Sequence, residues 1–212
     1  MGPIVVINPN SNQAVTDGLD AALDAYRLGP AIECLTLAEG PFGIESDAHV
    51  AQVIDPLVHM VQSRPDAAAF VLACYSDPGL AECRAAVSQP VFGIQESGTL
   101  TAMTRGARFG VIAIAEASVA RHRRYIERMG VLDRLVAELP LGMSVDETAR
   151  GADTFERLVE TGSALVEQGS DSVILGCAGM AKHRAPLEAA LGKPVIEPTQ
   201  AAVVMALGAV LA

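Results

Sequence analysis

The chain has 212 residues, of which half are hydrophobic, 4% are aromatic and none is Trp, so Ala, Val, Leu and Ile must supply most of the core. This length suits one large domain or two small ones. The formal net charge of −10 argues against nucleic acid or an anionic membrane surface as a partner. A small anionic substrate could still bind to backbone N–H groups.

The start of the chain and its cysteines predict a cytoplasmic location. Met1 is followed almost directly by an apolar run, without the basic segment of a signal peptide. No apolar stretch reaches the roughly 18 residues of a membrane span. Four cysteines in such a chain indicate free thiols in a reducing compartment. The sequence has no Cys-x-x-Cys or His-x-x-x-His pair and no glycine-rich phosphate loop, so we expect no metal site.

In chain order, short apolar runs typical of buried strands alternate with helical patterns. The expected strands are 4–8, 31–37, 69–74, 91–93, 109–114, 137–139, 172–176 and 195–196. The expected helices are 12–27, 47–63, 78–88, 118–129, 153–168, 181–191 and 199–211. This alternation predicts an α/β fold whose mainly parallel sheets are flanked by helices on both faces.

The sequence also repeats itself at an offset of about half its length. Three pairs of segments resemble each other in the same order: 3–7 with 109–114, 66–74 with 169–177, and 89–94 with 193–197. Such a repeat predicts two halves related by a pseudo-twofold axis. We expect residues 1–98 with a C-terminal helix over 199–212 to form one half and residues 99–198 to form the other. Because ligands of open α/β sheets bind beyond the C-terminal strand ends, we expect the active site in the cleft between the halves.

Cys74 and Cys177 occupy matching places in the two halves, each after an apolar strand and before a helix. Two thiols that face one cleft can remove a proton from one side of a carbon and return it to the other, one as thiolate base and one as thiol acid. A helix N-terminus favours the thiolate, so we expect lowered thiol pKa values. A disulfide between these cysteines is a competing interpretation, which requires close approach and an oxidising compartment.

Polar loops supply further candidates. Asn10 and Ser11 follow the first strand, where they can cap the next helix and bind a carboxylate or an imide carbonyl. In the loop over 40–47, Ser46 is a natural cap, and Phe42 is either a pocket wall or a core residue. Small residues after each cysteine leave backbone N–H groups free to stabilise an oxyanion.

The remaining polar and sulfur-bearing residues have plainer interpretations. Asp77 and Pro78 suit the N-cap and first position of the helix over 78–88. Cys34 and Cys83 read as packing residues. We interpret His49, His59 and His122 as surface or satisfied residues, the run 121–124 as a solvated helix face, and His183 as a residue outside the site.

The sequence resembles the aspartate/glutamate/hydantoin racemase superfamily, and most closely its hydantoin and allantoin racemases. Four motifs spread over nearly the whole chain carry the resemblance: Ile7-Asn8-Pro9-Asn10-Ser11, Gly40-Pro41 with Ile44-Glu45-Ser46, Cys74 with Asp77-Pro78-Gly79-Leu80, and Leu175-Gly176-Cys177-Ala178-Gly179-Met180. The resemblance implies a homo-oligomer that racemises a small molecule without a cofactor, with Cys74 and Cys177 as the acid/base pair. It also implies substrate contacts from Asn10, Ser11, Tyr75, Ser76, Ala178 and Gly179.

Departures from the superfamily's patterns narrow the substrate. Amino-acid racemases usually have Asn-Thr after the first cysteine and Thr-His after the second, where this chain has Tyr75-Ser76 and Ala178-Gly179. These differences favour a 5-substituted hydantoin or a related ureide such as allantoin. Arylmalonate decarboxylases keep only the second cysteine, so Cys74 argues against that activity. Two alternatives stay open: a maleate-type cis–trans isomerase with Cys74 as nucleophile, and a binding protein that kept the cleft without catalysis.

Overall fold

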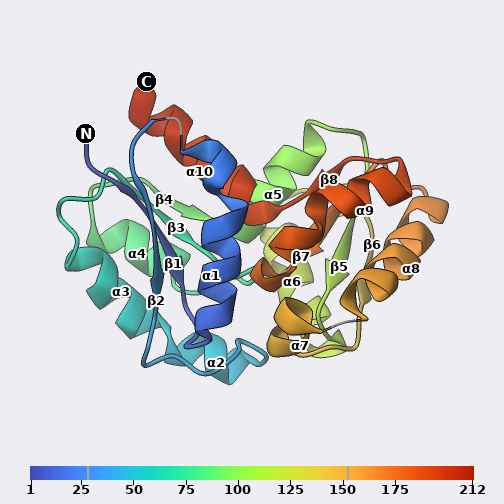
Figure 1. Ribbon diagram of the computed structural model, residues 1–212, viewed down its shortest axis with the longest axis horizontal. Helices are drawn as coiled ribbons and strands as arrows, with labels where there is room; N and C mark the ends of the chain where they lie inside the picture. The colour runs from blue at the N-terminus through green and yellow to red at the C-terminus, as the bar shows by residue number, and fades with distance from the viewer. Residues whose placement is uncertain (28, 152) are drawn as a thin grey trace.

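The computed structural model describes residues 1–27, 29–151 and 153–212, and it consists of two α/β halves that lie side by side (Figure 1). Each half contains a parallel four-stranded sheet. The strand order is β2-β1-β3-β4 in the first sheet and β6-β5-β7-β8 in the second, so the second sheet repeats the order of the first. This confirms the predicted α/β fold with two similar halves.

The first sheet is covered on both faces. Its strands are β1 (Ile4–Asn8), β2 (Ile32–Thr36), β3 (Ala69–Leu72) and β4 (Val91–Gly93). Side chains alternate across a strand, so Ile4 and Val6 pack in one apolar cluster with α1 (Gln13–Ala22) and α10 (Pro198–Leu211). Val5 and Ile7 pack in a second cluster with α3 (Ile54–Gln62) and α4 (Leu80–Ala86). Burial on both faces explains why these strands are apolar throughout.

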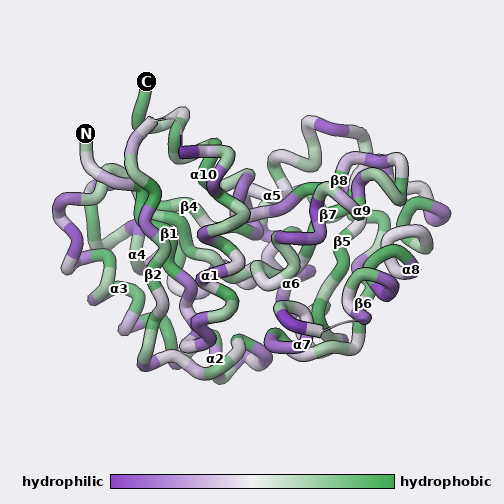
Figure 2. Tube along the Cα trace, in the orientation of Figure 1, coloured by the Kyte–Doolittle hydropathy of each residue, from purple (hydrophilic) through white to green (hydrophobic). Residues whose placement is uncertain are grey.

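The second sheet is built in the same way. Its strands are β5 (Phe109–Ala113), β6 (Leu135–Pro140), β7 (Ser172–Gly176) and β8 (Val195–Ile196). Its main helices are α5 (Ile94–Met103), α6 (Glu116–Arg128), α8 (Thr154–Glu167) and α9 (Arg184–Leu191). Figure 2 shows the strands at the centre of each half mostly in hydrophobic green, while purple stretches lie mainly on outer helices and loops.

Two helices join the halves. The C-terminal helix α10 packs against α5 and against β1, β3 and β4 of the first sheet, although it follows the last strand of the second. In the other direction, α1 contacts α7 (Val145–Arg150) and the 3₁₀ helix Ala178–His183 of the second half. One apolar cluster therefore contains strands of both sheets. The division at residues 98 and 198 stays a prediction.

Several predicted elements differ from the observed ones. The helix expected over 12–27 ends at Ala22, and the one expected over 47–63 is divided into α2 (Asp47–Gln52) and α3. Two helices, α5 and α7, were not predicted. The inward face of α5 carries polar residues, so the segment lacks the apolar periodicity of an amphipathic helix. The six-residue α7 is too short for a pattern, although its N-cap Ser144 and its third residue Glu147 form a capping box.

Asp77 caps a different helix from the one expected. α4 begins at Leu80, after Gly79 in the left-handed conformation, and not at Pro78. The Asp77 carboxylate instead accepts the N–H groups of Gln95 and Glu96, each at 2.9 Å, in the first turn of α5. The cap role is right and the predicted helix is wrong, because the loop after Cys74 folds back onto the end of β4.

Over the three described ranges, no helix is both long and apolar enough to cross a membrane.

Candidate active site

A pocket lies between the two halves, beyond the carboxyl ends of β3 and β7. Cys74 and Cys177 both line it, and each follows its strand closely. Residues from both halves form its walls. The aliphatic part of the wall consists of Val15, Ile44, Ile114 and Val145. The pocket therefore brings together the two thiols that the sequence repeat singled out.

Burial favours the neutral form of both thiols. Desolvation raises the pKa of Cys74 to about 12, and the charge of a nearby Cys177 thiolate adds to this, while the N–H of Ser76 lowers the pKa. Desolvation also raises the pKa of Cys177, against hydrogen bonds from the N–H of Gly179 and the hydroxyl of Thr148. All four cysteines of the chain are free thiols.

The expectation of lowered thiol pKa values is wrong. Cys74 does not sit at a helix N-terminus, because α4 begins only at Leu80. Cys177 is the N-cap of a 3₁₀ helix of only six residues, Ala178–His183. The dipole of so short a helix is small, so the cost of burying a thiolate outweighs it.

Thr148 is the side chain that contacts Cys177. Its Oγ1 lies 3.7 Å from the Cys177 sulfur and 2.7 Å from the Val145 carbonyl oxygen. A hydroxyl has one hydrogen and two lone pairs. When the Cys177 group is a thiol, it can donate to Thr148 while Thr148 donates to Val145. When it is a thiolate, the same hydroxyl can rotate and donate to the sulfur.

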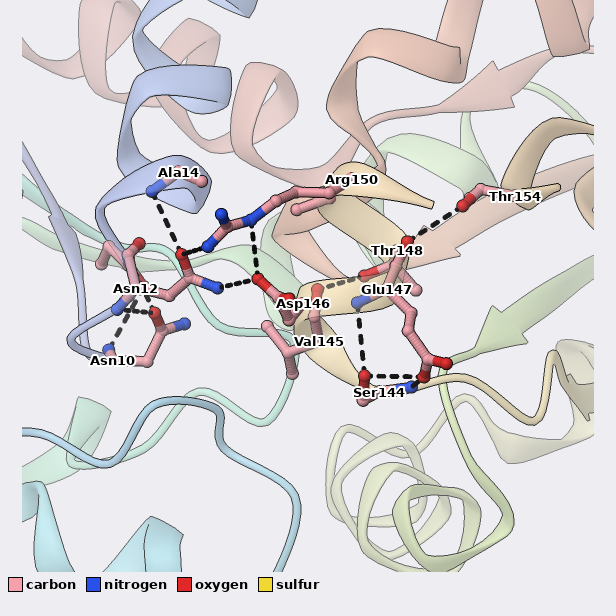
Figure 3. Close-up of polar contacts among 12 residues, drawn as sticks. Asn10, Asn12, Ala14, Ser144, Val145, Asp146, Glu147, Thr148, Arg150 and Thr154 are labelled. Atoms are coloured by element: carbon pink, nitrogen blue, oxygen red, sulfur yellow. Dashed lines mark hydrogen bonds and ion pairs between the residues drawn. The ribbon is translucent and has the colours of Figure 1, made fainter. Parts of the chain in front are cut away.

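The helix that carries Thr148 is fixed to the other half of the molecule (Figure 3). Asn12 caps α1 by accepting the N–H of Ala14, and its Nδ2 donates to Asp146 of α7 at 2.9 Å. Arg150 forms an ion pair with Asp146 at 2.8 Å and donates to Asn12. This contact between α1 and α7 holds Thr148 beside Cys177.

Asn10 lies in the pocket and is held by its own loop. Its Oδ1 accepts from Asn8 Nδ2 at 3.0 Å and from the N–H of Asn12 at 2.9 Å. Asn8 Nδ2 also donates to Thr16 of α1. Because these bonds occupy the oxygen, the Nδ2 group of Asn10 is left as the donor for a ligand.

Three predicted site residues lie outside the pocket wall. Ser11 is held by a backbone bond to Pro41, and Ser46 caps α2 by accepting the N–H of His49. The Phe42 side chain is 55% exposed, so it is neither a core residue nor part of the wall. Ile44, two residues later in the same loop, takes the wall position.

The residues that follow each cysteine do line the pocket. The ring of Tyr75 packs edge-on against His122, with centroids 5.0 Å apart, and burial raises the pKa of its phenol well above the usual value. On the other side, Ala178 and Gly179 form the wall. A Cβ at Gly179 would lie 3.0 Å from Thr148 Oγ1, so glycine permits the close approach of α7 at this point.

The helix α6 contributes residues that the sequence analysis assigned to a solvated face. Arg121 Nε donates to Ser76 Oγ at 2.8 Å, and His122 Nε2 lies 3.3 Å from the same oxygen. The other imidazole nitrogen, Nδ1, lies 2.5 Å from a Glu138 carboxylate oxygen. The solvated-face interpretation is therefore wrong for Arg121 and His122. The buried residues of α6, Ser118, His122 and Ile126, recur every four positions, but two of them are polar, so this face does not form an apolar stripe in the sequence.

The other histidines lie away from the pocket wall. His183 stacks on Phe155 with centroids 6.0 Å apart, and His49 and His59 bond to nearby backbone groups of their own segments. In the part of the chain that the structure describes, no group of three His, Cys, Asp or Glu side chains is placed to hold a metal ion.

The family model of the Asp/Glu/hydantoin racemases matches residues 4–206. The chain is 32% identical to a hydantoin racemase from Paenarthrobacter aurescens, over 94% of this chain and 87% of that protein. It is also 32% identical to a hydantoin racemase from Pseudomonas sp. (strain NS671), over 94% and 82%. The solved structure of an allantoin racemase from Klebsiella pneumoniae superposes with a TM-score of 0.95 at 27% identity, over 100% of this chain and 88% of that one. The chain therefore belongs to the Asp/Glu/hydantoin racemase family, which makes it an isomerase of the racemase class.

Proposed function

We propose that this protein racemises a 5-substituted hydantoin by moving a proton at C5 between Cys74 and Cys177. The observation that carries the proposal is the position of the two thiols. They follow equivalent strands of the two halves, β3 and β7, and line one pocket. A planar intermediate between them would be reached from both sides, which is the requirement for inverting a carbon.

In this mechanism one cysteine begins as thiolate and the other as thiol. The thiolate takes the C5 proton, and the electron pair of the C–H bond moves into the ring carbonyl to give an enolate. Asn10 Nδ2 and the hydroxyl of Ser76 are the donors available to the oxyanion. The second thiol then donates its proton to the opposite face. The two cysteines thereby exchange protonation states, and the reverse reaction starts from the state that the forward reaction leaves.

The raised pKa values define the reactive state. Both thiols are neutral when fully buried, so the active enzyme has lost one proton from the pair. The N–H of Ser76 stabilises that charge on Cys74, and Thr148 with the N–H of Gly179 stabilises it on Cys177. We expect the rate to rise with pH from the acid side, because the fraction of singly ionised pairs grows.

The wall of the pocket favours a hydantoin with an aliphatic 5-substituent. The C5–H of a hydantoin is acidified by the adjacent ring carbonyl, which suits thiols as acid and base. Val15, Ile44, Ile114 and Val145 offer apolar surface for the substituent, and such surface favours hydrocarbon over a polar group. Allantoin carries a polar ureido group at this carbon, so we place it second.

The test follows C5–H exchange for deuterium and loss of optical rotation with enantiopure 5-isobutylhydantoin, allantoin, aspartate and maleate. We expect both signals with the hydantoin. Cys74→Ser and Cys177→Ser should each lower the rate by about 100-fold or more. Cys34→Ser is the matched control, because that thiol lies outside the pocket wall. Normal racemisation by both active-site variants would overturn the two-thiol mechanism. Turnover of maleate alone would favour a cis–trans isomerase, and binding without turnover a non-catalytic homologue.

The setting of the enzyme is part of the same proposal. Four free thiols suit a reducing cytoplasm, and the apolar, uncharged α10 exposes Val204 and Leu211 on a surface that a second copy could cover. We propose a cytoplasmic homo-oligomer. Light scattering of the purified protein measures the assembly directly, and a monomer at all concentrations would contradict it.

A further inference from the structure

Two side chains of α6 contact the hydroxyl oxygen of Ser76, which is the second residue after Cys74. Arg121 Nε lies 2.8 Å from Ser76 Oγ, and His122 Nε2 lies 3.3 Å from it. A guanidinium can only donate, so the oxygen accepts from Arg121. An imidazole nitrogen can donate or accept. The protonation of His122 Nε2 therefore decides where the Ser76 hydroxyl hydrogen points.

The other ring nitrogen of His122 faces a buried carboxylate. His122 Nδ1 lies 2.5 Å from Glu138 Oε1, and the two side chains are only 3% and 1% exposed. The second carboxylate oxygen, Oε2, is buried without a hydrogen-bond partner among the described residues. A pair buried this deeply is least costly when its net charge is zero.

A neutral pair has three proton arrangements that keep the Nδ1–Oε1 hydrogen bond, and two of them give the same result at Ser76. In one, an imidazolium faces a carboxylate, and both ring nitrogens carry hydrogen. In the other, a carboxylic acid donates to Nδ1, and the remaining ring hydrogen is on Nε2. Nε2 lacks its hydrogen if the pair becomes anionic, with a neutral imidazole that donates from Nδ1 to the carboxylate. It also lacks its hydrogen if a neutral imidazole donates from Nδ1 to a carboxylic acid protonated on Oε2, but that proton would be buried without an acceptor among the described residues.

We propose that Arg121 and the His122–Glu138 pair together fill both lone pairs of Ser76 Oγ and so turn its O–H into the pocket, as a preset donor to the oxyanion. The role of this hydroxyl as a donor to an oxyanion rests on the proposed function. His122 and Glu138 are positioning residues that act through Ser76. A hydroxyl that is already oriented needs no reorganisation when charge develops next to it. With a bare Nε2, Ser76 would donate to His122 and be lost to the substrate.

Other contacts keep His122 in place. Gln95 Nε2 donates to its backbone carbonyl at 2.9 Å, and the Tyr75 ring packs on the imidazole at an interplanar angle of 85°. On the Arg121 side, the guanidinium also bonds to Asp47 and Ser118. Both donors are thus held by groups other than Ser76, as a preset arrangement requires.

Nitrogen-15 NMR of the whole protein labelled at histidine tests the arrangement without any substrate. Near neutral pH, we expect a proton on Nε2 of His122. The signal is assigned by its loss in the His122→Leu/Glu138→Leu variant, which removes the donor and leaves no buried charge unpaired. A His122 Nε2 without hydrogen overturns the proposal, whether or not the protein racemises hydantoins.

Kinetics then test whether the pair acts through Ser76. We expect Ser76→Ala to lower kcat by about 100-fold and His122→Leu/Glu138→Leu to lower it by about tenfold, with KM little changed. In the Ser76→Ala background, removal of the pair should change kcat by less than about twofold. His122→Gln/Glu138→Leu, which restores an N–H donor, should recover part of the loss. An equal loss with and without the Ser76 hydroxyl would overturn the proposal. A wild type that does not exchange C5–H would instead contradict the proposed function, and the NMR result would still stand.

Discussion

The two halves place a cysteine at the same point of the same strand order, yet surround it differently. At the end of β3, Cys74 is followed by Tyr75 and Ser76, and Ser76 connects it to a charged network on α6. At the end of β7, Cys177 is followed by two small residues and contacts the hydroxyl of Thr148. The repeat of the fold positions the thiols. The polar side chains around them come from different helices, α6 near Cys74 and α7 near Cys177.

A racemase must run its reaction in both directions. In the proposed mechanism, each cysteine serves as base in one direction and as acid in the other. On the Cys74 side the supporting donors are a backbone N–H and an ionic network, while on the Cys177 side they are a backbone N–H and a neutral hydroxyl. We therefore expect substitutions on the two sides to affect the two directions unequally.

The largest effect is expected where the halves differ in backbone packing. Gly176 occupies the place that Ala73 occupies in the first half, and a Cβ there would lie 2.6 Å from the carbonyl oxygen of Ile112. Gly176→Ala should therefore lower the free energy of unfolding by about 2–4 kcal/mol, since the central strands must separate. Urea denaturation measures the loss. Ala73→Gly is the matched control and should cost about 1 kcal/mol or less. Equal losses would mean that the two strand ends are equally tolerant.

Two buried carboxylates, those of Asp77 and Glu197, cap α5 and α10. Burial raises the pKa of Asp77 to about 7 and that of Glu197 to about 6, above the value of about 4 in an unfolded chain. The native state therefore binds more protons than the unfolded state from about pH 4 to about pH 7. Stability should fall as the pH rises through this window, by at most about 1.4 kcal/mol per pH unit for each group.

Asp77→Asn and Glu197→Gln separate the two contributions. Each variant stays neutral, so its share of the slope should disappear, and the share of Asp77 should extend to higher pH. Free energies of unfolding measured at several pH values provide the comparison. If both variants keep the full slope of the wild type, other groups cause it.

On the Cys177 side, Thr148→Val removes the hydroxyl that stabilises the thiolate. The pKa of Cys177 should rise, so kcat should fall by about five- to tenfold and the acid limb of the pH profile should move to higher pH. The loss should be greater in the direction in which Cys177 is the base. Thr148→Ser keeps the hydroxyl and should retain most of the activity. A Val variant with an unchanged pH profile would show that the 3.7 Å contact has no part in the reaction.

Much of the fold follows from the sequence because buried parallel strands are apolar on both faces. β1, β4, β7 and β8 have the predicted bounds, and the repeat of strand order follows from the repeat of segments. α5 escaped prediction because its buried face carries Gln95, Ser97 and Thr99. The turn after Cys74 was not predicted either, because Asp77 accepts a hydrogen bond from α5, the helix that the sequence pattern did not indicate.

The candidate site is less predictable because its polar groups meet only in three dimensions. The repeat was enough to find the two cysteines. Arg121, His122 and Glu138 read as ordinary charged residues until α6 and β6 bring them to Ser76. In the loop over 40–47, the residue that lines the pocket is the buried Ile44, while Phe42, which was predicted as a candidate, is exposed. Burial, which sets the direction of the thiol pKa values, is likewise a property of the whole fold.

The smallest effect is expected at the contact between α1 and α7. Asn12→Ala removes both the cap of α1 and the bond to Asp146, so the free energy of unfolding should fall by about 1 kcal/mol. Asn12→Ser keeps a cap but is too short to reach Asp146, so it isolates the contact between the halves. Because α7 carries Thr148, both variants should speed hydrogen exchange of the α7 amides and lower kcat by two- to threefold. Faster exchange with unchanged kcat would mean that Thr148 stays beside Cys177 without the help of Asn12, and that the first half does not control the chemistry of the second.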